Sequence, residues 1–165
     1  MTAALKADVN RRAAALFAAI DDYEEAAFIA EIDALADELP EDDGDRLFHQ
    51  ASARDSWGHS DLAVPLYARA LELGSLTGEN RRRAVIQMSS SLRNVGRVEE
   101  ALANLVKERE NGEDHLSDAL DCTIALCLST LGRDREGLSL VITALAKHLP
   151  RYNRSMANYA RLLGE

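Results

Sequence analysis

The fold is decided by the stretch "WGHSDLAVPLYARALELG", residues 57–74, in which apolar side chains recur at helical spacing behind a glycine. Two later stretches have the same layout: "VGRVEEALANLVKER", residues 95–109, and "LGRDREGLSLVITAL", residues 131–145. Their glycines, Gly58, Gly96 and Gly132, mark a unit that recurs along the chain at a period of 36–38 residues.

The recurring unit keeps the size of its side chains at fixed distances from the glycine. Small residues lie five positions after it, larger apolar residues nine after it, and small residues seven before it: Ala63, Ala101 and Gly137; Tyr67, Leu105 and Val141; Ala51, Ser89 and Ala125. Small residues let two paired helices approach closely, and larger ones interlock with the next pair. The pattern predicts an all-α solenoid of stacked antiparallel helix hairpins.

Turn and capping residues divide the rest of the chain in the same way, and they predict nine helices in a single domain, residues 1–165. Counting one repeat length upstream from Gly58 leads to Asp21. This predicts a degenerate first hairpin that has no glycine at its turn. The predicted repeats cover residues 7–40, 44–74, 80–110 and 114–149, and a capping helix covers 151–163.

The small-residue, glycine, alanine and tyrosine positions resemble the tetratricopeptide repeat family, and "YARALELG", residues 67–74, is the closest single match. The resemblance covers about residues 46–148, and it extends to a bacterial subgroup of such repeats. The period is longer than the usual period of about 34 residues, and most copies lack the family's proline after the second helix. The resemblance implies a right-handed superhelix whose first helices line a concave surface.

The charge distribution argues against several classes of partner. The chain has a net charge of −9, and residues 1–45 hold 13 acidic residues against 3 basic ones. An acidic surface repels nucleic acid and anionic membranes, so neither is expected as a partner. The N-terminus does not have the pattern of a secretory signal, and no apolar stretch approaches a membrane span, so we expect a cytoplasmic protein.

The residues that could act in catalysis or bind a metal do not form a recognisable motif. Cys122 and Cys127 are five positions apart on a predicted helix, which places them on different sides of it. No phosphate-binding loop, nucleophile elbow or zinc-helix motif occurs in the sequence. We therefore expect a protein that is not an enzyme and uses no cofactor or metal.

The first helices of the hairpins supply the candidate binding surface. The register predicts a binding surface of concave positions, with His49 at its edge: Phe48, Ser52, Asp55, Ile86, Ser90, Arg93, Asn94, Cys122 and Leu126. Further concave candidates include Arg11, Asp45 and Arg83. We expect a non-catalytic interaction module that binds a peptide or protein in this groove. The alternative is a regulatory domain that senses a small molecule in the same groove.

Two points are left open by the sequence. Asp55 and Arg93 occupy equivalent positions in adjacent repeats, so they form either a structural ion pair or an anchor for a ligand. Self-association of the chain as a homodimer, through a terminal helix, is also left open.

Overall fold

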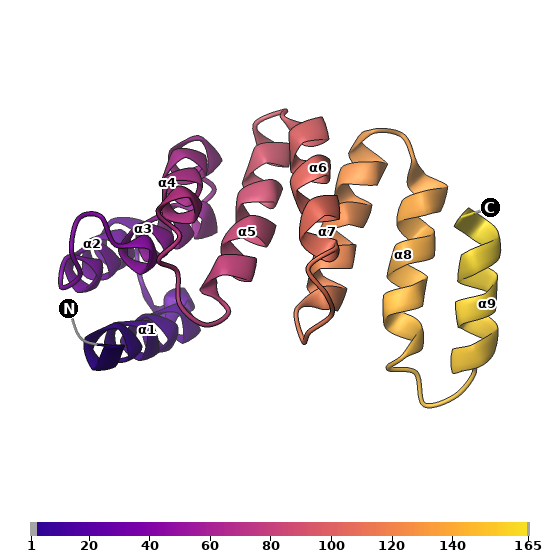
Figure 1. Ribbon diagram of the computed structural model, residues 1–165, viewed down its shortest axis with the longest axis horizontal. Coiled ribbons are helices and arrows are strands. Elements are labelled where there is room, and N and C mark those ends of the chain that lie inside the picture. Colours follow the sequence, from indigo (N-terminus) through magenta and orange to yellow (C-terminus); the bar gives the residue numbers. More distant parts are fainter. Residues whose placement is uncertain (1–2, 165) are drawn as a thin grey trace. The chain divides into compact units, whose positions relative to one another are not determined.

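The computed structural model describes residues 3–164, and within this range it contains nine α-helices and no strand (Figure 1). The predicted all-α class is therefore confirmed, as is the number of helices. The chain divides into two compact units, Met1–Ser91 and Leu92–Glu165. That both belong to a single domain stays a prediction. None of the described helices is both long and apolar enough to cross a membrane.

The first unit consists of two hairpins and most of a fifth helix. Its helices are α1 (Ala3–Ala18), α2 (Glu25–Ala36), α3 (Gly44–Ser56), α4 (Ser60–Leu73) and α5 (Asn80–Asn94), and a short 3-10 turn, η1 (Ile20–Asp22), follows α1. Consecutive helices from α1 to α4 pack together, and α1 also contacts α3. This is the neighbour-to-neighbour packing of a helical-repeat solenoid.

Aromatic side chains fill the core between the first two hairpins. Phe28 is fully buried, and its ring lies 5.2 Å from that of Phe17, 5.7 Å from that of Tyr23 and 6.5 Å from that of Trp57. Offset and edge-to-face pairs at these distances add to the free energy gained by burial alone. Trp57 thus packs beside its turn, in the hairpin elbow.

The second unit continues the pattern with α6 (Val98–Arg109), α7 (Ser117–Thr130), α8 (Asp134–Ala146) and α9 (Asn153–Gly164). Each helix packs against the next, from α6 to α9. Its core is built from aliphatic side chains and one cysteine, including Leu105, Leu120 and Cys127, which are all fully buried.

The three repeat glycines adopt one and the same turn. Gly58, Gly96 and Gly132 have φ angles of 84°, 82° and 76°, in the left-handed region that favours glycine. In each case the amide after the glycine donates to the carbonyl five residues back, at 3.0, 2.8 and 2.8 Å, as in a Schellman motif: His59 to Arg54, Arg97 to Leu92, and Arg133 to Leu128. The repeat predicted from sequence spacing is therefore a structural repeat.

The small residues that recur at fixed positions of the repeat also have a structural reason. Ala63 and Ala101 are fully buried, and a Cβ atom added at Gly137 would lie 2.9 Å from the carbonyl oxygen of Ala125. Only small residues permit this approach between the two helices of a hairpin.

Val141 departs from the expected pattern, because it is 38% exposed whereas Tyr67 and Leu105 at the equivalent positions are fully buried. The following helix, α9, packs on another side of α8, where the Ser139 hydroxyl donates to the carbonyl of Ala160 at 2.6 Å. The side of α8 that carries Val141 is left exposed.

Candidate functional site

The first unit contains a pocket of about 850 Å³ between α1, α3, the segment 77–79 and the start of α5. These helices are the first helices of three successive hairpins, which the sequence predicted to line a concave surface. Apolar groups of α1, including Phe17, Ala7 and Ala14, form one part of the lining. Polar side chains form the rest.

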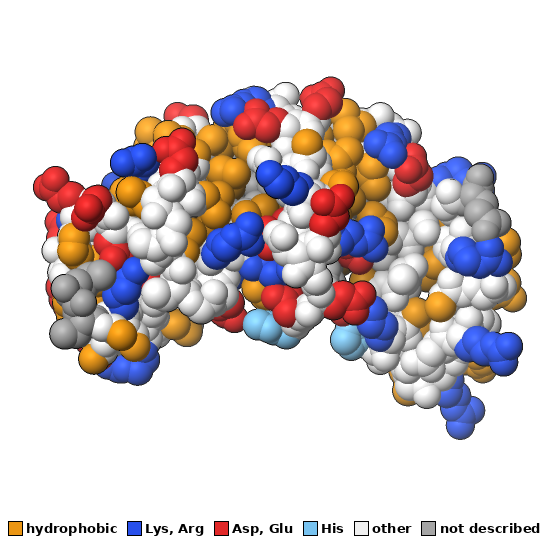
Figure 2. Space-filling view, in the orientation of Figure 1, with side chains coloured by type: hydrophobic (Ala, Val, Ile, Leu, Met, Phe, Trp, Pro, Cys, Tyr) orange, Lys and Arg blue, Asp and Glu red, His pale blue; other side chains and the backbone are white. Residues whose placement is uncertain are grey.

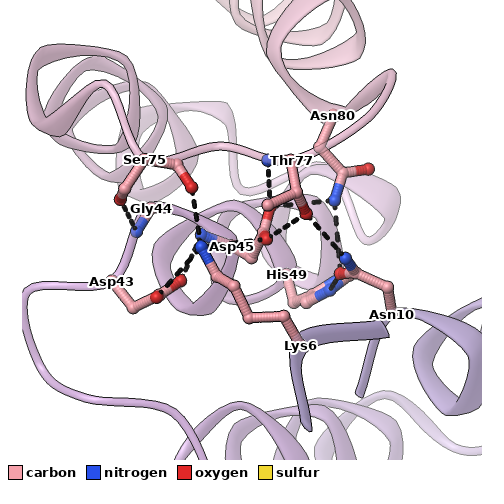
Figure 3. A network of polar contacts seen from close by, with 9 residues as sticks. All are labelled: Lys6, Asn10, Asp43, Gly44, Asp45, His49, Ser75, Thr77 and Asn80. Atoms are coloured by element: carbon pink, nitrogen blue, oxygen red, sulfur yellow. Dashed lines mark hydrogen bonds and ion pairs between the residues drawn. The ribbon is translucent and has the colours of Figure 1, made fainter. Parts of the chain in front are cut away.

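The polar part of the pocket is built around Asp45, whose side chain is fully buried (Figure 3). Asp45 accepts hydrogen bonds from the backbone amide of Thr77 at 3.1 Å, from the Thr77 hydroxyl at 2.5 Å and from Asn80 Nδ2 at 3.0 Å. Burial alone would raise the pKa of Asp45, but the hydrogen bonds from Asn80 and Thr77 and the charge of Lys6 outweigh it and lower the pKa. Asp45 is therefore a buried carboxylate ion at neutral pH.

Lys6 supplies the opposite charge from α1. Its Nζ lies 3.1 Å from Asp43, 3.3 Å from Asp45 and 2.6 Å from the carbonyl oxygen of Ser75, to which it donates (Figure 3). Asp43 also caps α3, where its side chain accepts from the amide of Asp45 at 2.9 Å. One ammonium group thus joins α1, the start of α3 and the loop after α4.

Asn10 and His49 complete the network on the pocket side (Figure 3). Asn10 Oδ1 lies 2.6 Å from His49 Nε2 and accepts from Asn80 Nδ2 at 3.2 Å, while Asn10 Nδ2 donates to the Thr77 hydroxyl at 3.1 Å. Because Asn10 Oδ1 is an acceptor, His49 carries its proton on Nε2.

His49 is buried and uncharged. Its side chain is only 4% exposed, and Nδ1 has no hydrogen-bond partner. Burial lowers the pKa of His49 to about 4, against the attraction of Asp45 and Asp43 and together with the repulsion of Arg83. The imidazole is therefore a neutral donor at physiological pH and not a general base with access to a substrate.

Two arginines provide the cations at the pocket. The guanidinium of Arg83 lies over the ring of Phe48, 5.1 Å from its centroid. Arg83 also donates a hydrogen bond to Asn80 Oδ1 at 3.3 Å, and its Nη1 lies 3.8 Å from a carboxylate oxygen of Glu79. Arg11 is mostly exposed and donates to Asp8 at 2.6 Å. All three cations are paired with carboxylates, but Lys6 is only 10% exposed, whereas the side chains of Arg11 and Arg83 are 71% and 35% exposed. An anionic ligand could therefore reach Arg11 and Arg83, in competition with Asp8 and Glu79.

Two of the predicted binding residues lie in the core. Phe48 is 1% exposed and packs against the ring of Tyr67 at 6.1 Å, beneath the guanidinium of Arg83. Ser52 is 2% exposed, accepts from the Tyr67 hydroxyl at 3.2 Å and donates to Gln87 at 3.4 Å. Because both side chains are buried, neither can contact a bound peptide. They form part of the core beneath the predicted groove.

The other predicted residues of the first unit lie outside the pocket. Ile86 and Ser90 are half-buried on α5. Asp55 accepts a hydrogen bond from the Ser91 hydroxyl at 2.5 Å, and burial raises its pKa despite this bond. Their part in binding stays a prediction.

The second unit holds the remaining predicted residues. Arg93 donates to Thr130 Oγ1 at 3.4 Å and to Asn94 Oδ1 at 3.3 Å. Cys122 and Leu126 are exposed on α7. Asp55 and Arg93 each have a partner within their own unit, and their predicted pairing stays a prediction.

Of the polar network, the sequence analysis named Asp45 among the concave positions and His49 at the edge, and it missed Lys6, Asn10, Thr77 and Asn80. Asn10 and Asn80 are separated by 70 residues, and neither belongs to a recognisable motif. Within residues 3–164, no group of three or more His, Cys, Asp or Glu side chains is placed to hold a metal ion.

The comparison with known families agrees with the repeat geometry. A family model described as tetratrico peptide repeat matches residues 44–163, which span α3 to α9. No curated protein and no solved structure matches the sequence. Repeats of this family generally mediate protein–protein interactions and are typically non-catalytic scaffolds. Because the match covers well over half of the sequence, and the three glycine turns repeat in the structure, the chain belongs to the tetratricopeptide repeat family.

Proposed function

We propose that the first unit binds a segment of a partner protein in the pocket between α1, α3 and α5, without catalysis. The observation that carries the proposal is a rigid polar floor with an exposed cation, Arg11, beside it. Asn10, His49 and Asn80 form this floor, and hydrogen bonds to one another and to the buried Asp45 fix them. A fixed floor loses little conformational entropy when a ligand binds.

The lining indicates which kind of segment fits. An apolar side chain of the partner would contact Phe17 and the alanines of α1, and a neighbouring carboxylate would be held by Arg83 or Arg11. The guanidinium group forms paired hydrogen bonds with carboxylates, which gives orientation as well as affinity. We therefore expect a segment that combines acidic and large apolar residues.

Selection from a displayed library of random 12-residue peptides tests the proposal. Peptides enriched on the full chain would be synthesised, and their affinity for the wild type and for Arg11→Glu and Arg83→Glu would be measured by fluorescence anisotropy. We expect enrichment of acidic–apolar sequences and a loss of affinity of about tenfold or more in each variant, because a repulsive contact replaces an attractive one. Arg69→Glu, on the exposed side of α4, is the matched control.

Two results would contradict the proposal. One is a library that yields no binding sequence, and the other is a set of bound peptides whose affinity is the same in both pocket variants. The polar floor gives a further check, since Asn10→Ala should weaken the same peptides while the helix content measured by circular dichroism is kept.

A small anionic molecule is a second candidate for the same pocket. The volume of about 850 Å³ lies within the usual range for small-molecule sites, roughly 300–1,000 Å³. A panel of small dicarboxylates in a thermal-shift assay would test this candidate. It is supported by an increase in melting temperature that Arg83→Glu abolishes and Arg69→Glu does not, and the absence of any such increase would exclude these ligands.

A further inference from the structure

We propose that Asn111 is a self-modification site, at which the backbone nitrogen of Gly112 displaces ammonia from the asparagine side chain and aspartate or isoaspartate results. The new carboxylate then lies against the buried Glu108 and loosens the end of α6. The site belongs to the second unit, whereas the pocket lies in the first, so the inference does not depend on the proposed function.

The sequence singles out Asn111 among the asparagines. The chain has seven of them, and only Asn111 is followed by glycine. Asparagine is a thermolabile residue, and a Cβ atom on the next residue hinders the approach of that residue's nitrogen to the carboxamide. The residues that follow the other six asparagines all have a Cβ atom: Arg11, Arg81, Val95, Leu105, Arg154 and Tyr159.

The turn after α6 requires this glycine and exposes the pair to water. Gly112 has a φ angle of 103°, which residues with a side chain rarely adopt. Asn111 and Gly112 are both exposed, and a Cβ atom added at Gly112 would meet no atom within 4 Å. The reactive pair is therefore part of the geometry of the turn.

Hydrogen bonds to the end of α6 control how often the pair can react. Asn111 Nδ2 donates to Glu108 Oε2 at 3.0 Å, and the Gly112 amide donates to the carbonyl of Arg109 at 3.4 Å. The second bond is long and lies in a loop, where local opening costs less free energy than it does in the core. An opening that breaks this bond lets the Gly112 nitrogen turn toward Cγ of Asn111.

The reaction needs only water as a co-reactant. The Gly112 nitrogen gives its proton to hydroxide and bonds to Cγ of Asn111. The Cγ–Nδ2 bond breaks, and Nδ2 takes a proton from water and leaves as ammonia, which restores the hydroxide. Water then opens the resulting succinimide ring at either carbonyl carbon. One opening gives aspartate, and the other gives isoaspartate, in which the backbone runs through the former side chain.

The product places a negative charge where the native turn has a hydrogen-bond donor. Glu108 is only 3% exposed, and its Oε2 atom accepts from the Nδ2 atom that leaves. A carboxylate has acceptor oxygens and no donor, so two carboxylates then face each other across the former hydrogen bond. The end of α6 loses a hydrogen bond and gains a repulsion.

The neighbouring sequence adds to this repulsion. Residues 107–114 hold four acidic residues against two basic ones, Lys107 and Arg109. Arg109 is already paired with Asp121, with 3.1 Å between Nε and Oδ1. Figure 2 shows acidic side chains at the lower ends of α6 and α7, where this loop runs. A further carboxylate therefore enters a region that is already negative.

Ageing of the full folded chain at mildly alkaline pH, followed by tryptic digestion and mass spectrometry, tests the reaction. The tryptic peptide 110–133 holds Asn111 and no other asparagine. This peptide should gain the mass difference between NH2 and OH, in separate chromatographic peaks for aspartate and isoaspartate, before any of the other six asparagines reacts. An unaged sample corrects for reaction during digestion, and Asn111→Gln should abolish the change.

The urea-unfolded chain, aged in parallel, shows how fast the pair reacts without the fold. If peptide 110–133 reacts there and stays unchanged in the folded chain, the turn protects Asn111 and the proposal is overturned. A second asparagine that reacts as fast as Asn111 in the folded chain would overturn it as well.

Asn111→Asp reproduces one of the products and tests the effect on α6. Its urea midpoint should be lower than that of the wild type, and aged wild-type protein should shift in the same direction as its modified fraction grows. Asn158→Asp adds the same charge at an exposed position of α9, where Arg161 donates to Asn158 Oδ1 at 3.3 Å, and should not lower the midpoint. Equal midpoints for Asn111→Asp and the wild type would show that the new carboxylate does not loosen α6.

Discussion

Arg54 binds Asp33 with both of its terminal nitrogens, Nη1 to Oδ1 at 2.9 Å and Nη2 to Oδ2 at 2.8 Å, and so joins α3 to α2. Asp33 occupies a position at which the repeat usually has a small apolar residue. The hydrogen bonds that Arg54 donates to Asp33 also raise the pKa of Arg54. The degenerate first hairpin thus replaces an apolar contact with an ion pair.

This pair should contribute measurably to stability, because both side chains are largely buried, with exposures of 22% and 30%. Asp33→Ala and Arg54→Ala should each lower the free energy of unfolding, and their coupling in a double-mutant cycle should be about 1 kcal/mol. Urea denaturation of the four proteins measures it. The exposed pair Arg69–Glu72 is the control and should couple by less than about 0.5 kcal/mol. Additive effects at Asp33 and Arg54 would contradict the prediction.

The repeat turn gives a second prediction, at Gly96. No atom lies within 4 Å of a Cβ added there, so the cost of a substitution comes from the backbone alone, whose φ angle is 82°. Gly96→Ala should lower the free energy of unfolding by about 1–2 kcal/mol. Gly96→Asn should cost less, since asparagine tolerates the left-handed region. Thermal unfolding of the two variants checks the order, and equal losses would show that the backbone is not the cause.

The repeat architecture could be predicted because it depends on residue size and on turns, both of which the sequence shows directly. Gly58, Gly96 and Gly132 share one backbone geometry, and Ala63 and Ala101 share full burial at the same repeat position. Such requirements recur in every copy, so they appear as a period in the sequence.

The lining of the pocket could not be predicted in the same way. Phe48 was placed on the open surface and is buried, whereas the next residue, His49, lines the pocket. Both side chains are buried, but one residue turns a helix by about 100°, so Phe48 packs on Tyr67 in the core while His49 lies against the pocket. The contacts of Asn10 with Asn80 and Thr77 join positions nearly half the chain apart and leave no local pattern.

The buried small residues give a third prediction, for which α6 offers a matched pair. Ala101 is fully buried at a repeat position, and Ala103 is exposed two residues later. Ala101→Leu should destabilise the protein by about 1–3 kcal/mol, because it adds three carbon atoms at a position with no exposed surface. Ala103→Leu makes the same chemical change and should have an effect within about 0.5 kcal/mol. Chemical denaturation compares the two variants, and similar midpoints would show that the surroundings of Ala101 can accommodate a larger side chain.

The burial of His49 makes the first unit sensitive to acid. The pKa of His49 is about 4 in the folded protein, mainly through burial, and about 6.5 in the unfolded chain. Between these values the unfolded state binds more protons, so the free energy of unfolding falls as the pH is lowered from about 6.5 towards 4. Asp45 and Asp43 oppose the low pKa and Arg83 supports it, so the charges around the ring do not change this direction.

His49→Gln should remove this part of the pH dependence, because a glutamine amide can donate to Asn10 Oδ1 and does not titrate. Between pH 7 and pH 4.5 the wild type should lose about 2 kcal/mol relative to the variant. Urea denaturation of both proteins at each pH measures the difference. His115→Gln, at an exposed position, controls for the loss of one imidazole. If the wild type and His49→Gln lose the same free energy over this range, His49 is not held neutral by the fold, and the rigid floor of the pocket would need another explanation.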